Sequence, residues 1–178
     1  VRPRDPSLSR TPPPRSAPGN AARLDLNRLH LREAATPAEL RAFADTFAEI
    51  ASAGRASQSA AERLALQAVA VEHVADSVPP GDPQGDLRLF LVAVVARDSL
   101  GANAAAAGLF RRVVDEWPDG SYAAKALLAG RRLDPAWADA TDSLLAGRYA
   151  ESPYVLAARG GDRTAMGQLE DSLAAFER

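Results

Sequence analysis

His73 has the neighbours that come closest to a reactive site in this sequence. Asp76 follows it by three positions in a segment of helical periodicity, so the two side chains share a helix face and could ligate one metal ion. The sequence shows no third ligand. A solvated or hydrogen-bonded histidine is therefore the favoured interpretation, and an enzyme or metal site that uses His73 is the alternative.

The remaining polar groups are explained without catalysis. The acids of Asp115–Glu116 are adjacent, as are those of Glu170–Asp171, so the two side chains of each pair diverge on a helix. The run 160–162 is a turn without the glycine spacing that cradles phosphate. The chain contains no cysteine, which excludes disulfides, thiolate metal sites and cysteine nucleophiles. We therefore predict no catalytic residue, no cofactor and no bound metal.

The elements that position these groups are predicted to be helices. Alanine is abundant and aromatic residues make up only 6% of the chain, a composition that favours closely packed helices over sheets. Thr36, Pro37 and Glu39 form a helix-start signal, and Gly54 ends that helix. The further helices are expected at 21–32, 59–78, 87–97, 103–116, 122–133, 135–147, 153–159 and 164–176. Their short links predict an all-α fold of antiparallel helical hairpins.

One pattern occurs twice in the second half of the chain. Trp117 precedes Tyr122 by five positions, and 32 residues later Tyr149 precedes Tyr154 in the same way. The first copy belongs to a longer register of glycine, small, aromatic and proline positions: Gly101, Ala106, Phe110, Val113 and Pro118.

This register resembles the second half of a tetratricopeptide repeat, in which glycine marks the turn between two helices and an aromatic residue fills the space between repeats. The segment WPDGSYAAKALL also resembles the link between repeats in bacterial envelope proteins, namely outer-membrane-assembly lipoproteins and the Tol–Pal coordinator. The resemblance covers about residues 87–158. It implies a short, degenerate solenoid with repeats at about 87–120 and 121–153, within an all-helical domain at 36–178. Asp142 and Ala150 depart from the pattern of the first copy.

A separate segment precedes this domain. Residues 1–20 contain six of the thirteen prolines, and residues 1–35 carry seven arginines against three acids. We expect 1–35 to form an extended, basic, proline-rich arm and junction. A flexible linker is one interpretation. The other is an arm that binds acidic groups of a partner through four arginines: Arg2, Arg4, Arg10 and Arg15.

Two further groups of side chains are candidate partner contacts. The first comprises the paired arginines Arg111, Arg112, Arg131 and Arg132. The second comprises the aromatic residues Trp137, Tyr149 and Tyr154. The arginines are alternatively solvated or engaged in salt bridges, and the aromatics are alternatively packed between repeats.

These observations predict a non-catalytic protein–protein interaction or scaffold module. The resemblance places it in the bacterial cell envelope, in the periplasm or otherwise outside the cytoplasm, and an anchor upstream of Val1 would bring it to a membrane. The alternative is an extrinsic accessory subunit of a large membrane complex, in the envelope or a photosynthetic assembly. The net charge of −2 provides no basic field for a nucleic-acid partner.

Overall fold

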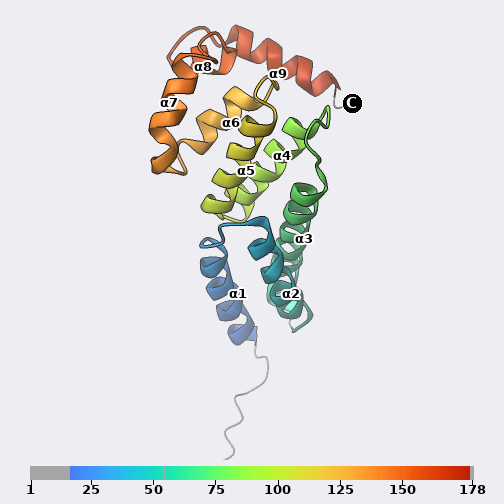
Figure 1. Cartoon of the computed structure of the whole chain (residues 1–178). Coiled ribbons are helices and arrows are strands. Elements are labelled where there is room, and N and C mark those ends of the chain that lie inside the picture. The colour runs from blue at the N-terminus through green and yellow to red at the C-terminus, as the bar shows by residue number, and fades with distance from the viewer. Residues whose placement is uncertain (1–16, 54, 177–178) are drawn as a thin grey trace, which may run out of the picture.

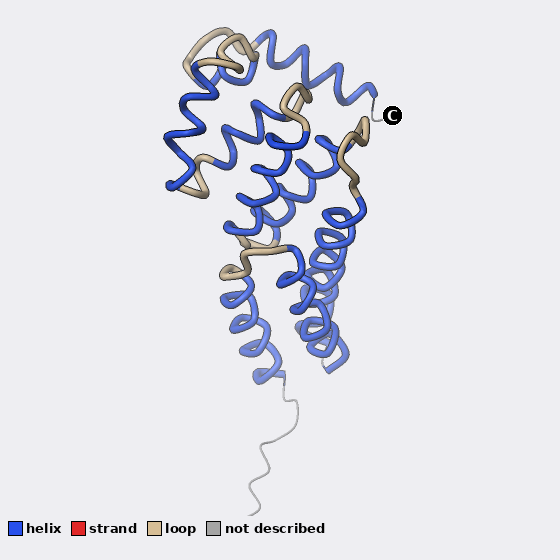
Figure 2. Tube along the Cα trace, viewed as in Figure 1, coloured by secondary structure: helices blue, strands red, loops and turns tan. Residues whose placement is uncertain are grey.

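The described part of the chain is helical. The computed structural model describes residues 17–53 and 55–176, and none of them lies in a β-strand (Figure 2). The α-helices are α1 Ala17–Leu31, α2 Pro37–Ala53, α3 Arg55–Ser77, α4 Gly85–Val94, α5 Asn103–Glu116, α6 Ala123–Gly130, α7 Ala138–Ala146, α8 Pro153–Ala158 and α9 Thr164–Phe176. A π-helical turn, η1 (Val95–Ser99), continues α4, and a 3₁₀ turn, η2 (Pro135–Trp137), precedes α7. The predicted all-α class is confirmed.

Most predicted boundaries lie within a few residues of the observed ones. The first helix begins at Ala17 instead of residue 21, so the predicted extended arm and junction at 1–35 is helical over residues 17–31. Leu24 and Leu31 of this helix are buried in the core. Pro18 is compatible with this helix because proline is tolerated in a first turn, where the amide hydrogen has no partner within the helix. The predicted contacts of Arg2, Arg4, Arg10 and Arg15 lie outside the described residues.

The helices follow one another along an elongated molecule. Figure 1 shows α1, α2 and α3 at one end, α4 and α5 in the middle, and α6 to α9 at the other end. The capping signal of α2 is present: the Glu39 amide donates to the Thr36 hydroxyl, and the Glu39 carboxylate accepts from the Ala35 amide. The helices α2 and α3 enclose fully buried side chains that include Leu40, Phe47 and Val71.

Arg112 is one of the residues that join α4 and α5 to the end formed by α1, α2 and α3. Arg112 of α5 donates from its guanidinium to the backbone carbonyls of Ala75 and Val78 at the end of α3, and it also pairs with Glu116. Phe110, on the same helix, is fully buried and its ring lies 5.5 Å from that of Phe90 on α4. The predicted burial of Phe110 is therefore confirmed.

Two glycines let tryptophan rings approach the backbone closely. A Cβ atom at Gly85, the first residue of α4, would lie 2.1 Å from a ring carbon of Trp117. A Cβ atom at Gly130, the last residue of α6, would lie 2.5 Å from a ring carbon of Trp137. Trp117 also donates from its indole nitrogen to the Asp82 carbonyl. These contacts set where α4 and α6 meet the segments beside them.

Candidate functional site

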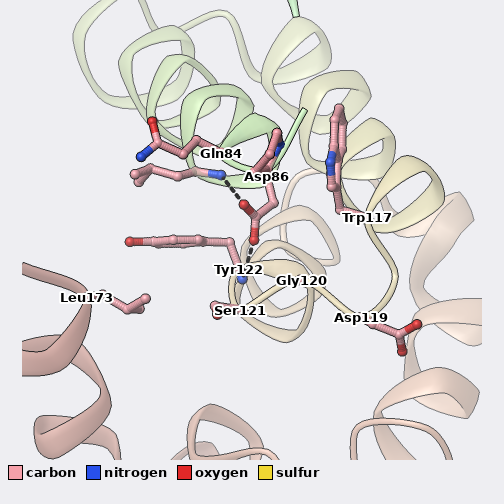
Figure 3. A pocket seen from close by; sticks show the side chains of 10 residues that line it. Gln84, Asp86, Trp117, Asp119, Gly120, Ser121, Tyr122 and Leu173 are labelled. Atoms are coloured by element: carbon pink, nitrogen blue, oxygen red, sulfur yellow. Dashed lines mark hydrogen bonds between the residues drawn. The ribbon is translucent and has the colours of Figure 1, made fainter. Parts of the chain in front are cut away.

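An open pocket of about 460 Å³ lies where the link after α5 meets the start of α4 and the far end of α9 (Figure 3). Trp117, Tyr122 and Leu87 form much of its wall, and Leu173 projects into it from α9. The buried Asp86 carboxylate accepts from the Leu87 amide at 2.8 Å and from the Tyr122 amide at 3.3 Å. Asp86 thereby fixes the link between α5 and α6.

Gly120 completes this arrangement. A Cβ atom there would lie 2.6 Å from a carboxylate oxygen of Asp86. The close approach brings the backbone after Trp117 against α4 at the floor of the pocket. Its acid is already hydrogen-bonded to backbone amides, which makes Asp86 a structural residue.

Beside this pocket, Lys125 of α6 is surrounded by aromatic rings. Its ammonium nitrogen lies 5.1 Å from the ring centroid of Phe90, 5.7 Å from that of Tyr122 and 5.3 Å from that of Tyr154. These distances are those of cation–π contacts. Lys125 also donates to the Glu170 carboxylate of α9 at 2.6 Å. We call these five residues the lysine cluster; they come from α4, the start and body of α6, α8 and α9.

The electrostatics of the lysine cluster suit the binding of a carboxylate. Burial raises the pKa of Tyr154 well above its usual value, and the neighbouring Glu170 carboxylate raises it further, so this hydroxyl keeps its proton. Burial is the largest single effect on Glu170 and acts to raise its pKa, but the Lys125 ammonium and the Tyr154 hydroxyl together outweigh it, so the pKa of Glu170 is lowered. The cluster therefore holds an ionised acid against a cation, and its tyrosine is a poor base near neutral pH.

A second pocket of about 460 Å³ lies at the other end of α9. Tyr154 and Leu128 line it together with Met166, which projects from the first turns of α9. Along this helix Met166, Leu169 and Leu173 are half-buried, and no side chain described in α9 is fully buried. The helix thus lies over the lysine cluster with an open pocket at each of its ends.

The four predicted contact arginines of the helical domain are placed differently from one another. Arg111 pairs with Asp134 at 2.9 Å and lies 4.9 Å above the Trp137 ring, whereas Arg131 pairs with Asp142 at 2.8 Å. Arg112 donates to the backbone carbonyls of Ala75 and Val78. Arg132 is exposed, and its guanidinium has no ion-pair or hydrogen-bond partner within the described ranges.

The three predicted aromatic contacts are buried. Trp137, Tyr149 and Tyr154 are each less than a tenth exposed, and the Tyr149 hydroxyl donates to the Pro118 carbonyl at 2.7 Å. The Tyr154 hydroxyl is buried without a well-oriented hydrogen bond in the described part of the chain. The structure therefore brings Tyr154 into the lysine cluster, and it packs Trp137 and Tyr149 into the core.

His73 is exposed on α3. Within residues 17–53 and 55–176 no three histidine or acidic side chains are grouped as metal ligands would be. No helix in the same ranges has the length and apolar character needed to cross a membrane.

No sequence motif marks Lys125, Glu170 or Phe90 as members of a binding site. A signal was present, because Lys125 is the one lysine in a chain whose other basic side chains are arginine and histidine. Lys125 lies on a mostly apolar helix, and nothing in the sequence around it indicates that aromatic rings from two other helices would surround its ammonium group. Comparison of the chain with protein-family models, with curated proteins and with solved structures finds no match.

Proposed function

We propose that this protein is a non-catalytic interaction module that binds a protein partner at the surface formed by α4, α6 and α8. The proposal rests on the lysine cluster, which α9 covers only in part and which lies between two open pockets. It combines a cation, large apolar side chains and unfilled volume, which are the features of a site that anchors a protein segment.

Features of the middle layer support a tetratricopeptide-like arrangement of helical hairpins within this proposal. Gly101 adopts a positive φ of 70° at the turn between η1 and α5, a conformation that glycine adopts without strain. Ala106 is fully buried, as a small residue at a close helix contact should be. Phe110 fills the space between α4 and α6, since its Cβ atom lies 3.3 Å from a Cβ built on Gly130. We propose the envelope location on the resemblance of the sequence alone.

Photo-cross-linking in the source cells tests the proposed function. A photoreactive residue at Leu91, which is half exposed one turn beyond Leu87 on α4, should give a discrete adduct with one protein. The matched control is Leu66, which is 71% exposed on α3. The partner, identified by mass spectrometry and purified, should then bind the isolated chain. Absence of an adduct at Leu91, or equal adducts at Leu91 and Leu66, would contradict the proposal.

A further inference from the structure

We infer that α9 is a displaceable internal occupant of the partner site, and that the site accepts an acidic amphipathic helix of another protein. This inference rests on the proposed function and names the kind of segment that binds. The surface at issue is the lysine cluster with its two flanking pockets, and α9 is the segment that the structure places on it.

The contacts of α9 follow one face of a helix. Met166, Leu169, Glu170 and Leu173 occupy positions i, i+3, i+4 and i+7, and these positions share one face. Glu170 binds Lys125, whereas Met166 and Leu173 each border a pocket. This is the pattern by which an amphipathic helix is recognised in a groove: apolar anchors at helical spacing and one charge that fixes the register.

The fit of α9 is incomplete. Each of its anchors is only half-buried, and each of the pockets at Met166 and Leu173 has a volume of about 460 Å³. A helix with bulkier apolar residues at these two positions would bury more apolar surface and bind more strongly. We call the surface of α4, α6 and α8 beneath α9, with its two pockets, the groove. The groove is therefore better suited to a larger ligand than to the helix that it holds.

The charge of the site selects the partner. Lys125 faces three aromatic rings and one carboxylate, so a helix without an acid at the matching position would leave the ammonium in an apolar setting without a counter-ion. This favours an acidic partner over a basic one.

The link before α9 permits displacement. The Gly161 amide donates to the Leu156 carbonyl, which fixes the chain up to that residue at the end of α8. Residues 160–165 are exposed, and the Asp162 carboxylate caps the start of α9 by accepting from Thr164. The helix can therefore leave the groove as a unit with its cap intact. As long as it is tethered, it competes with any partner at a high effective concentration.

The experiment measures binding of a labelled peptide to the full chain by fluorescence anisotropy. The probe is a peptide with the sequence of residues 162–176, which comprises α9 and its capping residue Asp162. The test variant is Glu170→Lys with Leu173→Ser in the chain, which weakens the docking of the internal helix and leaves the residues of α4, α6 and α8 unaltered. We expect this variant to bind the peptide at least tenfold more tightly than the unaltered chain does.

The matched control is Gln168→Lys, an exposed position on the same helix that should bind the peptide as weakly as the unaltered chain. A peptide with Glu170→Lys should lose binding to the test variant, and the chain variant Lys125→Glu should recover it. This charge exchange reports on the groove even where one variant is less stable. Equal binding by the test variant and the Gln168→Lys control would overturn the inference.

Two other results are informative. If the unaltered chain forms dimers by light scattering and the test variant does not, α9 exchanges between two copies, and the inference of a foreign helix is overturned. If Leu91 cross-links to a partner but the peptide does not distinguish the variants, the proposed function stands and only the role of α9 fails.

Discussion

The pair α2 and α3 and the pair α8 and α9 are both neighbouring helices joined by a short link, yet they are packed to different degrees. Between α2 and α3, Leu40, Phe47, Ile50 and Val71 are fully buried. By contrast, α9 has no fully buried side chain among those described, and α8 spans only the six residues Pro153–Ala158. Local stability follows buried apolar area, so the α8–α9 end should open far more readily than the α2–α3 end.

The difference suggests a division of roles. In the proposed function, the well-packed end is the scaffold and the loosely packed end is the surface whose occupant changes. Segments that move or bind are commonly drawn from the less stable parts of a fold.

The largest effect is expected at Phe110. Truncation in Phe110→Ala removes a fully buried ring that packs on Phe90, and it should lower the free energy of unfolding by about 3–5 kcal/mol. Leu173→Ala, at the edge of α9, should cost less than about 1 kcal/mol because that side chain is only half-buried. Urea denaturation measures both. Similar losses for the two variants would remove the contrast.

Overpacking at Gly85 should have the next largest effect. The added methyl group in Gly85→Ala meets the Trp117 ring, and it should lower the free energy of unfolding by about 1–3 kcal/mol. Gly108→Ala is the matched control, because a Cβ atom on that α5 residue has nothing within 4 Å. That variant should be stabilised by up to about 1 kcal/mol, since alanine favours a helix more than glycine does. Thermal unfolding that moved both variants in one direction would contradict these contacts.

Arg112 should matter more than its exposed neighbours. In Arg112→Ala the carbonyls of Ala75 and Val78 lose their side-chain donor, so unfolding should become easier by about 2 kcal/mol. Arg132→Ala removes an exposed guanidinium and should change the same free energy by less than about 0.5 kcal/mol. Chemical denaturation of the two variants separates a structural arginine from a solvated one. An Arg112 variant as stable as the Arg132 variant would show that α3 and α5 are held together by other contacts.

The smallest effect is expected from pH. The folded-state pKa of Glu170 is lowered, so its contribution to the docking of α9 is fully present above the unfolded value near 4.5 and is lost as the pH falls through the folded value. Because the pair with Lys125 is partly exposed, this contribution should be at most about 1 kcal/mol. A fluorophore at an exposed position of α9 should report release of the helix as the pH falls below about 4.5. In Glu170→Gln this transition should disappear.

The sequence predicted much of the fold. The helical spacing of apolar residues, the capping residues and the prolines are local signals, and they placed the helices from Thr36 to Phe176 close to their observed bounds. The buried position of Phe110 also followed from its place in the register that resembles a tetratricopeptide repeat. The start of α1 did not, because the prolines at 12–14 suggested an extended segment that would continue through Asn20.

The candidate site was harder to predict. Lys125, Phe90 and Glu170 are separated by 35 and 45 residues along the chain and meet only because α4, α6 and α9 converge. No local pattern encodes such a convergence. The sequence did identify Tyr154, since its aromatic repeat with Tyr149 is a local feature, but it could not show that the ring would face a lysine.

Hydrogen–deuterium exchange of the unaltered chain tests the central contrast most directly. We expect the amides of α9, residues 164–176, to exchange at least a hundredfold faster than those of α3 and α5 at neutral pH, because α9 detaches without unfolding of the core. Exchange of α9 at the same rate as α5 would contradict it, since α9 would then be a permanent part of the core and not a displaceable occupant of a binding site.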